Sequence, residues 1–202
     1  MGTGTLANLL DGTGVLYTGP TGESLPELDN LAPPLITVTP GGNWVAVGFS
    51  EQENHELDIE AEWENRYVSE HLGPVKAVCV REGGMFKIKF AEQDMTALNT
   101  GLSSRTTLAT QAAAADVTAQ DHLKFGDKAT TTQKALLYLD TNPESGSRII
   151  HIPYAVATEN VAFIKNLKGE GYDVGWTILC DPTATAGERM LFIYDLTAAA
   201  SS

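Results

Sequence analysis

The chain lacks positive charge in its first third, because no Lys or Arg precedes Arg66 in its 202 residues. Eleven acidic residues give the stretch 1–65 a formal charge of −11, out of −13 for the whole chain. Proteins that hold nucleic acid do so largely by placing Lys and Arg against phosphates. This charge distribution therefore argues against ordinary DNA or RNA binding.

The sequence is also poor in cysteine and has no long apolar run. Its first residues show neither a basic segment nor an apolar core, so we expect no secretory signal. No run approaches the ~20 apolar residues that span a bilayer. Cys79 and Cys180 each lie in an apolar, strand-like run, which favours two buried free thiols but leaves a disulfide open. We expect a soluble protein that folds in a reducing cytosol.

Motifs for catalysis and metal binding are scarce. The stretch GEGYDVG (169–175) misses the spacing of a dinucleotide-binding fingerprint by one residue, and its flanking strand-like runs favour a hairpin turn. The four histidines are scattered singly, without another His or Cys two or four positions away, which argues against zinc. His151, in RIIHIP, is expected to be a strand residue with a satisfied hydrogen bond. We expect no enzymatic activity, cofactor or metal.

Strand-like runs dominate the sequence. A short strand is expected near 14–18, within an extended Gly- and Pro-rich N-terminal arm at 1–34. Runs separated by Gly, Pro or polar breaks then predict one antiparallel β-sandwich or barrel domain over 35–202. Gly83-Gly84 predicts a tight hairpin turn between two of these strands. The expected strands are LITVTP, NWVAVGFS, the acidic segment 55–65, PVKAVCVRE, MFKIKF, KALLYLD, RIIHIPYAVA, NVAFIKNL, YDVGWTILC and RMLFIYDL.

One segment has helical periodicity, and it follows these first strands. In AEQDMTALNTGL (91–102), apolar residues recur at i, i+4, i+7 and i+11, with acids in the first turn. We expect one flanking α-helix there, covering a face of the sheet. Residues 103–121, rich in Ser, Thr and Ala, are expected to be an inserted loop. The predicted fold class is therefore mainly β, an antiparallel sandwich or barrel with one flanking helix, a long N-terminal arm and long loops.

The most unusual segment is HELDIEAEWEN, residues 55–65, in which acids occupy every even position from 56 to 64. Side chains on a strand alternate between its faces, so the pattern predicts one apolar face and one face of carboxylates about 6.6–7 Å apart. Aligned like charges cost stability, and Asp and Glu are poor strand formers. The carboxylates are Glu56, Asp58, Glu60, Glu62 and Glu64; the apolar residues are Leu57, Ile59, Ala61 and Trp63.

Several interpretations fit this acidic face. It fits a solvated sheet face, with Lys87 and Lys89 meeting some of the acids across the ladder if MFKIKF is the paired strand. Calcium needs oxygens that converge on one point, which a straight strand does not provide without a neighbouring loop. An acidic wall also repels phosphates, which suits a channel through which DNA slides without sticking.

The order of features along the chain is informative. A short strand precedes a G-T/E-x-L-P-like turn; a Trp-x-x-x-Gly element, an acidic strand and a strand leading into an acid-led helix follow. The back half contains RIIHIPYAVA, YDVGWTILCDP and LFIYD. In this order, the elements resemble the major tail tube proteins of long-tailed bacteriophages over most of the chain, except 103–121. The matching residues are Gly22, Glu23, Leu25, Pro26, Trp44, Gly48, Phe90, Glu92, Asp94, Leu98, Asp181 and Pro182.

The resemblance implies a non-enzymatic virion protein that forms stacked, six-membered rings around a lumen. The N-terminal arm and the extended segment 65–75 would bridge rings, and the five carboxylates of 56–64 would be candidate lumen-lining residues. The implied partners are other copies of the chain and the tape measure, tail terminator and distal tail proteins. DNA would pass through without specific binding and no membrane would be involved. The protein would be assembled in the host cytoplasm and reside in the virion tail.

Two other classes of function stay open. A monomeric β-sandwich binding module, for a carbohydrate or a protein on a virion or cell surface, would need an exposed aromatic platform. Trp44, Trp63 and Trp176 are each flanked by apolar residues, so we expect them in the core. An enzyme would need an acid/base pair of carboxylates, but no feature singles out one pair.

Overall fold

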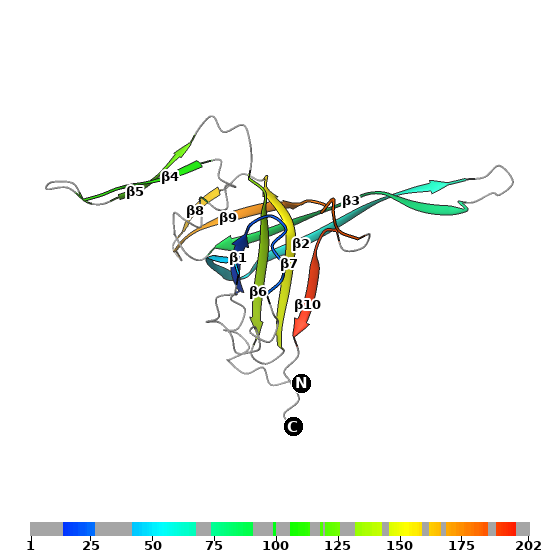
Figure 1. Ribbon diagram of the computed structural model, residues 1–202, viewed down its shortest axis with the longest axis horizontal. Coiled ribbons are helices and arrows are strands. Elements are labelled where there is room, and N and C mark those ends of the chain that lie inside the picture. The colour runs from blue at the N-terminus through cyan, green and yellow to red at the C-terminus, as the bar shows by residue number, and fades with distance from the viewer. Residues whose placement is uncertain are drawn as a thin grey trace, which may run out of the picture.

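The protein is mainly antiparallel β-structure, with ten strands in two sheets among the residues that the computed structural model describes (Figure 1). Those residues are 14–26, 42–67, 74–90, 99, 106–113, 118, 120–125, 132–142, 146–158, 162–166, 169–185 and 189–196. The strands are β1 (Gly14–Gly19), β2 (Val45–Arg66), β3 (Lys76–Phe90), β4 (Thr106–Gln111), β5 (Gln120–Phe125), β6 (Lys134–Asn142), β7 (Gly146–Ala157), β8 (Ala162–Asn166), β9 (Gly169–Ile178) and β10 (Phe192–Leu196).

Eight strands form the main sheet in the order β10-β7-β6-β1-β2-β3-β9-β8. Three further residue pairs join the end of β7 to the end of β9, so the sheet curls around its core. This arrangement confirms the predicted mainly β, antiparallel fold. The finer expectation of a sandwich or barrel stays a prediction.

The short strand predicted near 14–18 is confirmed as β1, and all six of its residues are buried. It lies between β2 and β6, so the sheet begins within the segment assigned to the arm. A buried Ser50 hydroxyl ties β1 in place, because it accepts a bond from the Gly14 amide and donates to the Gly14 carbonyl. The Tyr138 ring packs so closely on Gly14 that a side chain there would collide with it.

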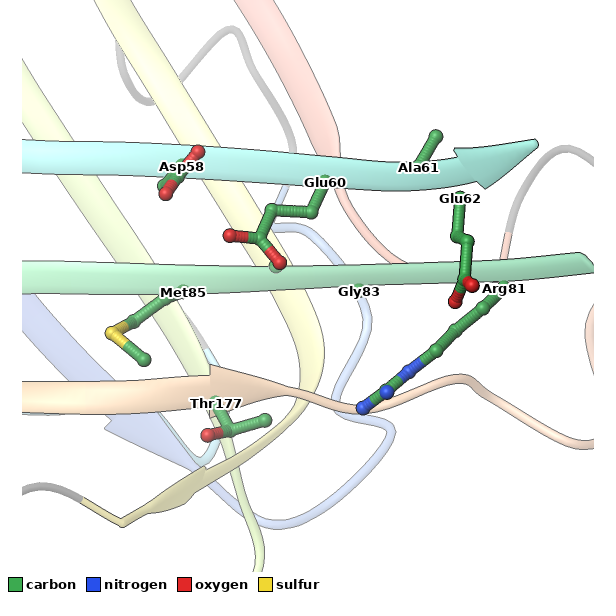
Figure 2. A pocket seen from close by; sticks show the side chains of 9 residues that line it. Asp58, Glu60, Ala61, Glu62, Arg81, Gly83, Met85 and Thr177 are labelled. Carbon is green, nitrogen blue, oxygen red and sulfur yellow. The ribbon is translucent and has the colours of Figure 1, made fainter. Parts of the chain in front are cut away.

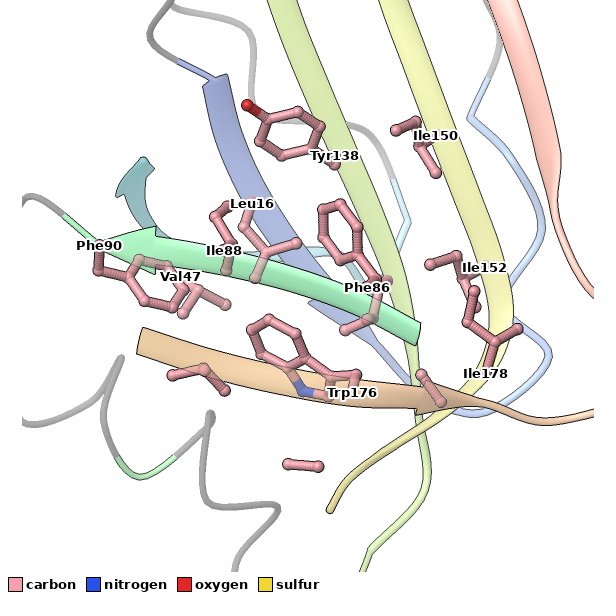
Figure 3. Packing of buried hydrophobic residues seen from close by; sticks show 14 residues of the cluster. Leu16, Val47, Phe86, Ile88, Phe90, Tyr138, Ile150, Ile152, Trp176 and Ile178 are labelled. Atoms are coloured by element: carbon pink, nitrogen blue, oxygen red, sulfur yellow. The ribbon is translucent and has the colours of Figure 1, made fainter. Parts of the chain in front are cut away.

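The described residues form two buried hydrophobic clusters, and the larger one, which we call the core, lies inside the curl of the sheet (Figure 3). Phe86 and Trp176 stack with ring centroids 6.2 Å apart, and Phe90 meets Trp176 edge-on at 6.4 Å. The core collects residues from β1, β2, β3, β6, β7 and β9, so the alternate residues of each strand point inward. These are Leu16, Val47, Phe86, Ile88, Phe90, Leu136, Tyr138, Ile150, Ile152, Ala155, Ala157, Val174, Trp176 and Ile178.

Gly83-Gly84 is not a turn, contrary to the sequence-based expectation. Both glycines lie inside β3, which runs from Lys76 to Phe90 and so joins most of PVKAVCVRE to MFKIKF in one strand. A tight turn would need these two runs to pair with each other. Both pair instead with β2, which at 22 residues is long enough to span them.

Two other expectations concern the middle of the chain. Residues 103–121 were expected to be a loop, but 106–111 form β4, which pairs with β5 in a separate two-stranded sheet. Neither buried cluster of the described residues includes a residue of this small sheet, and its sequence shows little apolar alternation. The helix expected at 91–102 lies outside the described residues apart from Asn99, as do LITVTP at 35–40 and the first thirteen residues of the arm.

His151 is a buried strand residue, as expected, but only one of its ring nitrogens is satisfied. Nε2 donates to the Glu23 carbonyl oxygen at 3.0 Å, whereas Nδ1 is buried without a hydrogen-bond partner. The ring packs between Trp44 and Phe192. Burial lowers the pKa of His151 below its ordinary value, and the bond to Glu23 opposes this only in part.

We predict that the free energy of unfolding falls as the pH drops below about 6.5, the ordinary pKa of histidine. Below that pH the unfolded chain takes up a proton that the buried His151 does not accept, so acid favours unfolding. Urea unfolding between pH 7.5 and 5.5 measures the slope. His151→Gln removes the titration and should flatten it; equal slopes for both proteins would contradict the prediction.

Candidate functional site

The acidic row is positioned by the pairing of β2 with β3. Leu57 lies opposite Phe86, which is fully buried, and packs against the core. Because the strand is pleated, the even-numbered residues of β2 must point the other way. All five carboxylates from Glu56 to Glu64 are exposed, on the face directed away from the core. The sequence-based prediction that they share one face is consistent with this arrangement.

One acid meets a lysine across the ladder. Glu56 lies opposite Lys87, and their charged groups are 3.5 Å apart. Exposed pairs of this kind contribute about 0–1 kcal/mol, so the pair does little to hold the fold. Farther along, Asp58 faces Met85 and Glu60 faces Gly83, while Glu62 faces Arg81. Two basic residues therefore face five acids, and the row keeps a net negative charge.

The acidic face is hollowed where β3 has no side chains. A groove of about 680 Å³ lies over Gly83 and Gly84, bordered by Asp58, Glu60 and Glu62 of β2 (Figure 2). Met85 and Arg81 of β3 and Thr177 of β9 complete its walls. A methyl group at Gly83 would meet nothing within 4 Å, so no packing constraint requires a glycine there. Glycine inside a strand often marks a place where another chain comes close.

The carboxylates do not form a metal site. They follow the strand in a line, at about 6.6–7 Å intervals, and so point in parallel instead of converging. Across the described ranges, no group of three or more His, Cys, Asp or Glu side chains is arranged to hold an ion. The row is an extended electrostatic surface and not a binding pocket for one small ion.

The apolar side chains on the opposite face of β2 are more exposed than the sequence predicted. Trp44 and Trp176 are buried, as predicted, but Trp63 is 61% exposed and Ile59 is 55% exposed. The reason is visible in Figure 1, where β2 and β3 continue as a two-stranded ribbon well beyond the rest of the sheet. We call residues 59–66 and 76–83 the ribbon. The sequence alone gave no sign of this boundary, because the alternation of 55–65 continues unchanged from the sheet into the ribbon.

The two cysteines are free thiols, but they are not buried as predicted. Cys79 is half-buried on the ribbon, opposite Trp63, and Cys180 is exposed just after β9. The run around Cys79 lies on the ribbon, before β3 reaches the core at Phe86, and the run around Cys180 passes the last core residue of β9, Ile178, before it reaches its cysteine. Strand-like composition therefore identified the strands without showing how far the core extends along them.

The comparisons with known proteins leave the family undetermined. A scan against protein-family models found no match, and a search of curated proteins found none either. Within the described part of the chain, none of the helical structure has the length and hydropathy that crossing a bilayer requires. The functional argument therefore rests on the acidic face, the ribbon and the edges of the sheet.

The two glycines beneath the groove should respond differently to the same change. We predict that Gly83→Ala is neutral or stabilises the fold by about 0.5–1 kcal/mol, because the added methyl group enters open space and restricts the unfolded chain. Gly84→Ala should destabilise it by about 1–3 kcal/mol, since its Cβ would lie 3.0 Å from Ile178 Cδ1 and 3.2 Å from the Asp58 carbonyl oxygen. Urea unfolding of both variants measures this; equal effects would contradict the assigned strand geometry.

Proposed function

We propose that this protein is a structural subunit that self-assembles into stacked rings, the major tail tube protein of a long-tailed bacteriophage. The rings, six-membered in the family that the sequence resembles, would form the conduit through which the phage DNA leaves the virion. The observation that carries the proposal is the exposed row of five carboxylates, directed away from the core on one long strand. In this role Glu56, Asp58, Glu60, Glu62 and Glu64 line the lumen.

The sign of the charge suits a conduit for DNA. A wall that carries Lys or Arg would pair with phosphates and retard the passing strand, whereas carboxylates repel it. The two basic residues that face the row, Lys87 and Arg81, are outnumbered by its five acids, and Lys87 is paired with Glu56. Repeating the same face around a ring would present many carboxylates to the lumen while leaving the sandwich or barrel core unchanged.

The open edges of the sheet supply surfaces for assembly. β8 and β10 end the strand order, and each offers one edge without a strand partner among the described residues. The ribbon adds two more such edges, since β1 pairs with β2 only as far as Phe49 and β9 pairs with β3 only from Gly84 onward. Exposed edges invite pairing with another chain, so a monomer would carry an aggregation hazard that a ring turns into joints.

A second candidate function is a monomeric binding module, and one observation favours it. Exposed Trp63 and Tyr67 lie near the distal end of the ribbon, where aromatic side chains are available to contact a carbohydrate or a protein. The two functions differ in self-association, which a tube requires and a monomeric module does not. That difference is directly measurable.

The experiment that tests the proposal is the solution mass of the purified protein over a concentration series, with negative-stain images of the same samples. Rings or hollow filaments support the tube. A mass of 21.6 kDa at every concentration, without rings, shifts the assignment to the binding module. Added carbohydrate or protein partners would then be the next ligands to examine.

The lumen assignment makes a separate prediction. Glu60→Lys combined with Glu62→Lys changes the row by four charges per subunit at exposed positions, so folding and tube formation should persist. DNA passage should fall, because lysines would then bind the backbone. Infectivity of virions that carry the variant measures passage, and Glu60→Gln with Glu62→Gln should give an intermediate loss. Normal infectivity of the lysine variant would exclude these residues from the lumen.

A further inference from the structure

The sheet buries a second apolar cluster on the face opposite the core. Along β1, β6 and β7, residues of the core alternate with residues of this second cluster, so the two lie on opposite faces of these strands. A short segment after β1, residues 23–26, covers part of the second cluster, because its Leu25 packs against it. We call this segment the strap. The members of the second cluster are Val15, Tyr17, Trp44, Ala135, Leu137, Leu139 and Ile149.

Two aromatic N–H groups hold the strap in place. His151 Nε2 donates to the Glu23 carbonyl oxygen at 3.0 Å, and Trp44 Nε1 donates to the next carbonyl oxygen, that of Ser24, at 3.2 Å. The two rings meet edge-on with centroids 5.8 Å apart, so each ring supports the position of the other. Both side chains are only 4% exposed. The attachment of the strap therefore depends on the state of the His151 ring.

The bond to Glu23 determines where the proton lies on that ring. A carbonyl oxygen can only accept, so Nε2 carries the hydrogen and Nδ1 keeps a bare lone pair. Nδ1 is buried and has no hydrogen-bond partner in the described part of the chain. A second proton can bind only there, where it would place a cation between the rings of Trp44 and Phe192. Burying a charge without a partner is costly, and burial accordingly lowers the pKa of His151.

The surroundings of the ring do little to offset such a cation. Of the residues that pair with His151, contact its ring or belong to the second cluster, only Glu23 carries a charged side chain. Its carboxylate is already engaged, because it accepts bonds from the backbone and side-chain amides of Asn43. The other titratable groups beside the strap and the second cluster are tyrosine hydroxyls, which stay neutral in acid. They belong to Tyr17, Tyr154 and Tyr194.

The strap can leave without the turn that precedes it. Gly22 has a φ of +74°, and its amide donates to the Pro153 carbonyl oxygen at 3.0 Å. The Thr21 hydroxyl donates to the Gln133 carbonyl oxygen at 3.1 Å. Neither bond involves the strap, so both can persist while the strap moves. Gly22, which lacks a Cβ and tolerates a wide range of backbone angles, is therefore the pivot.

We propose that the strap is a latch that opens in acid: a proton bound at His151 Nδ1 releases residues 23–26 from β7 while the sheet stays folded. Release brings the imidazolium into contact with water, which solvates its charge. Local opening of this kind needs less free energy than unfolding, since it breaks the bonds to the strap and the packing of Leu25 but leaves the core intact. The latch is a property of a single chain and does not depend on the proposed tube.

A cysteine in the strap reports its opening. In a background of Cys79→Ser and Cys180→Ser, Leu25→Cys places a thiol against the second cluster. Val174→Cys is the matched control, because Val174 is 2% exposed and belongs to the core. Each thiol is reacted with dithiodipyridine, and its rate is divided by the rate in urea-unfolded protein at the same pH. This ratio measures how often the thiol is open to solvent.

We expect opening of the strap to increase up to about tenfold from pH 7.5 to 5.5. Below about 6.5, the ordinary pKa of histidine, the open form takes up a proton that the closed form does not accept, so acid favours opening. The Val174→Cys thiol should stay protected over this range. His151→Gln keeps an N–H for the Glu23 carbonyl but does not titrate, so it should abolish the increase. Glu23→Gln should retain it, which excludes titration of the Glu23 carboxylate as the cause.

The outcomes are distinct. An unchanged ratio for Leu25→Cys between pH 7.5 and 5.5 would overturn the latch, as would an equal increase in the His151→Gln variant. A parallel increase for Val174→Cys would mean that the whole sheet opens, which overturns it as well. The profile with His151 intact decides even where His151→Gln fails to fold. An increase confined to the strap and abolished by His151→Gln supports the latch, and the solution mass decides the tube separately.

Discussion

The pairing of Leu57 with Phe86 is the constraint on which the functional surfaces depend. Phe86 is fully buried, so its partner on β2 must face the core. Strand pleating then directs Glu56 and Asp58 outward, and the same alternation continues along the ribbon. A shift of one residue would bring the carboxylates against the core and expose Leu57, which the cost of burying charge forbids.

The same alternation has different consequences along the length of β2. Near the sheet, its apolar side chains find a core, and the carboxylates are the exposed feature. Along the ribbon none of the described residues builds a core, so its apolar side chains Ile59, Trp63 and Val80 are exposed and form a surface in their own right. One periodic sequence thus yields two surfaces of opposite character, a charged face that repels phosphates and an apolar face that favours contact with protein.

Much of the fold could be predicted from the sequence, because most strands carry their own signal. β6 and β7 correspond to two predicted apolar runs, and the alternation of 55–65 predicted that the five carboxylates share one face. The errors share one physical cause, which is that local patterns do not report the extent of the core. Trp63 and Cys180 lie in apolar runs that outlast it, and Gly83-Gly84 resembles a turn only if the long partner strand is ignored. Tertiary pairing, not local preference, decided these positions.

The place of β1 in the sheet has a consequence for the order of folding. Its two neighbours are β2, which begins at Val45, and β6, which begins only at Lys134. During synthesis β1 must therefore wait until Lys134–Asn142, far along the chain, has been made before its second edge is paired. Contacts so distant in sequence fold slowly, because a long loop must close before they form. This central strand is thus synthesised before both of its neighbours and is among the last to be enclosed, so a nascent chain holds a strand that needs protection until it reaches its buried place in the sheet.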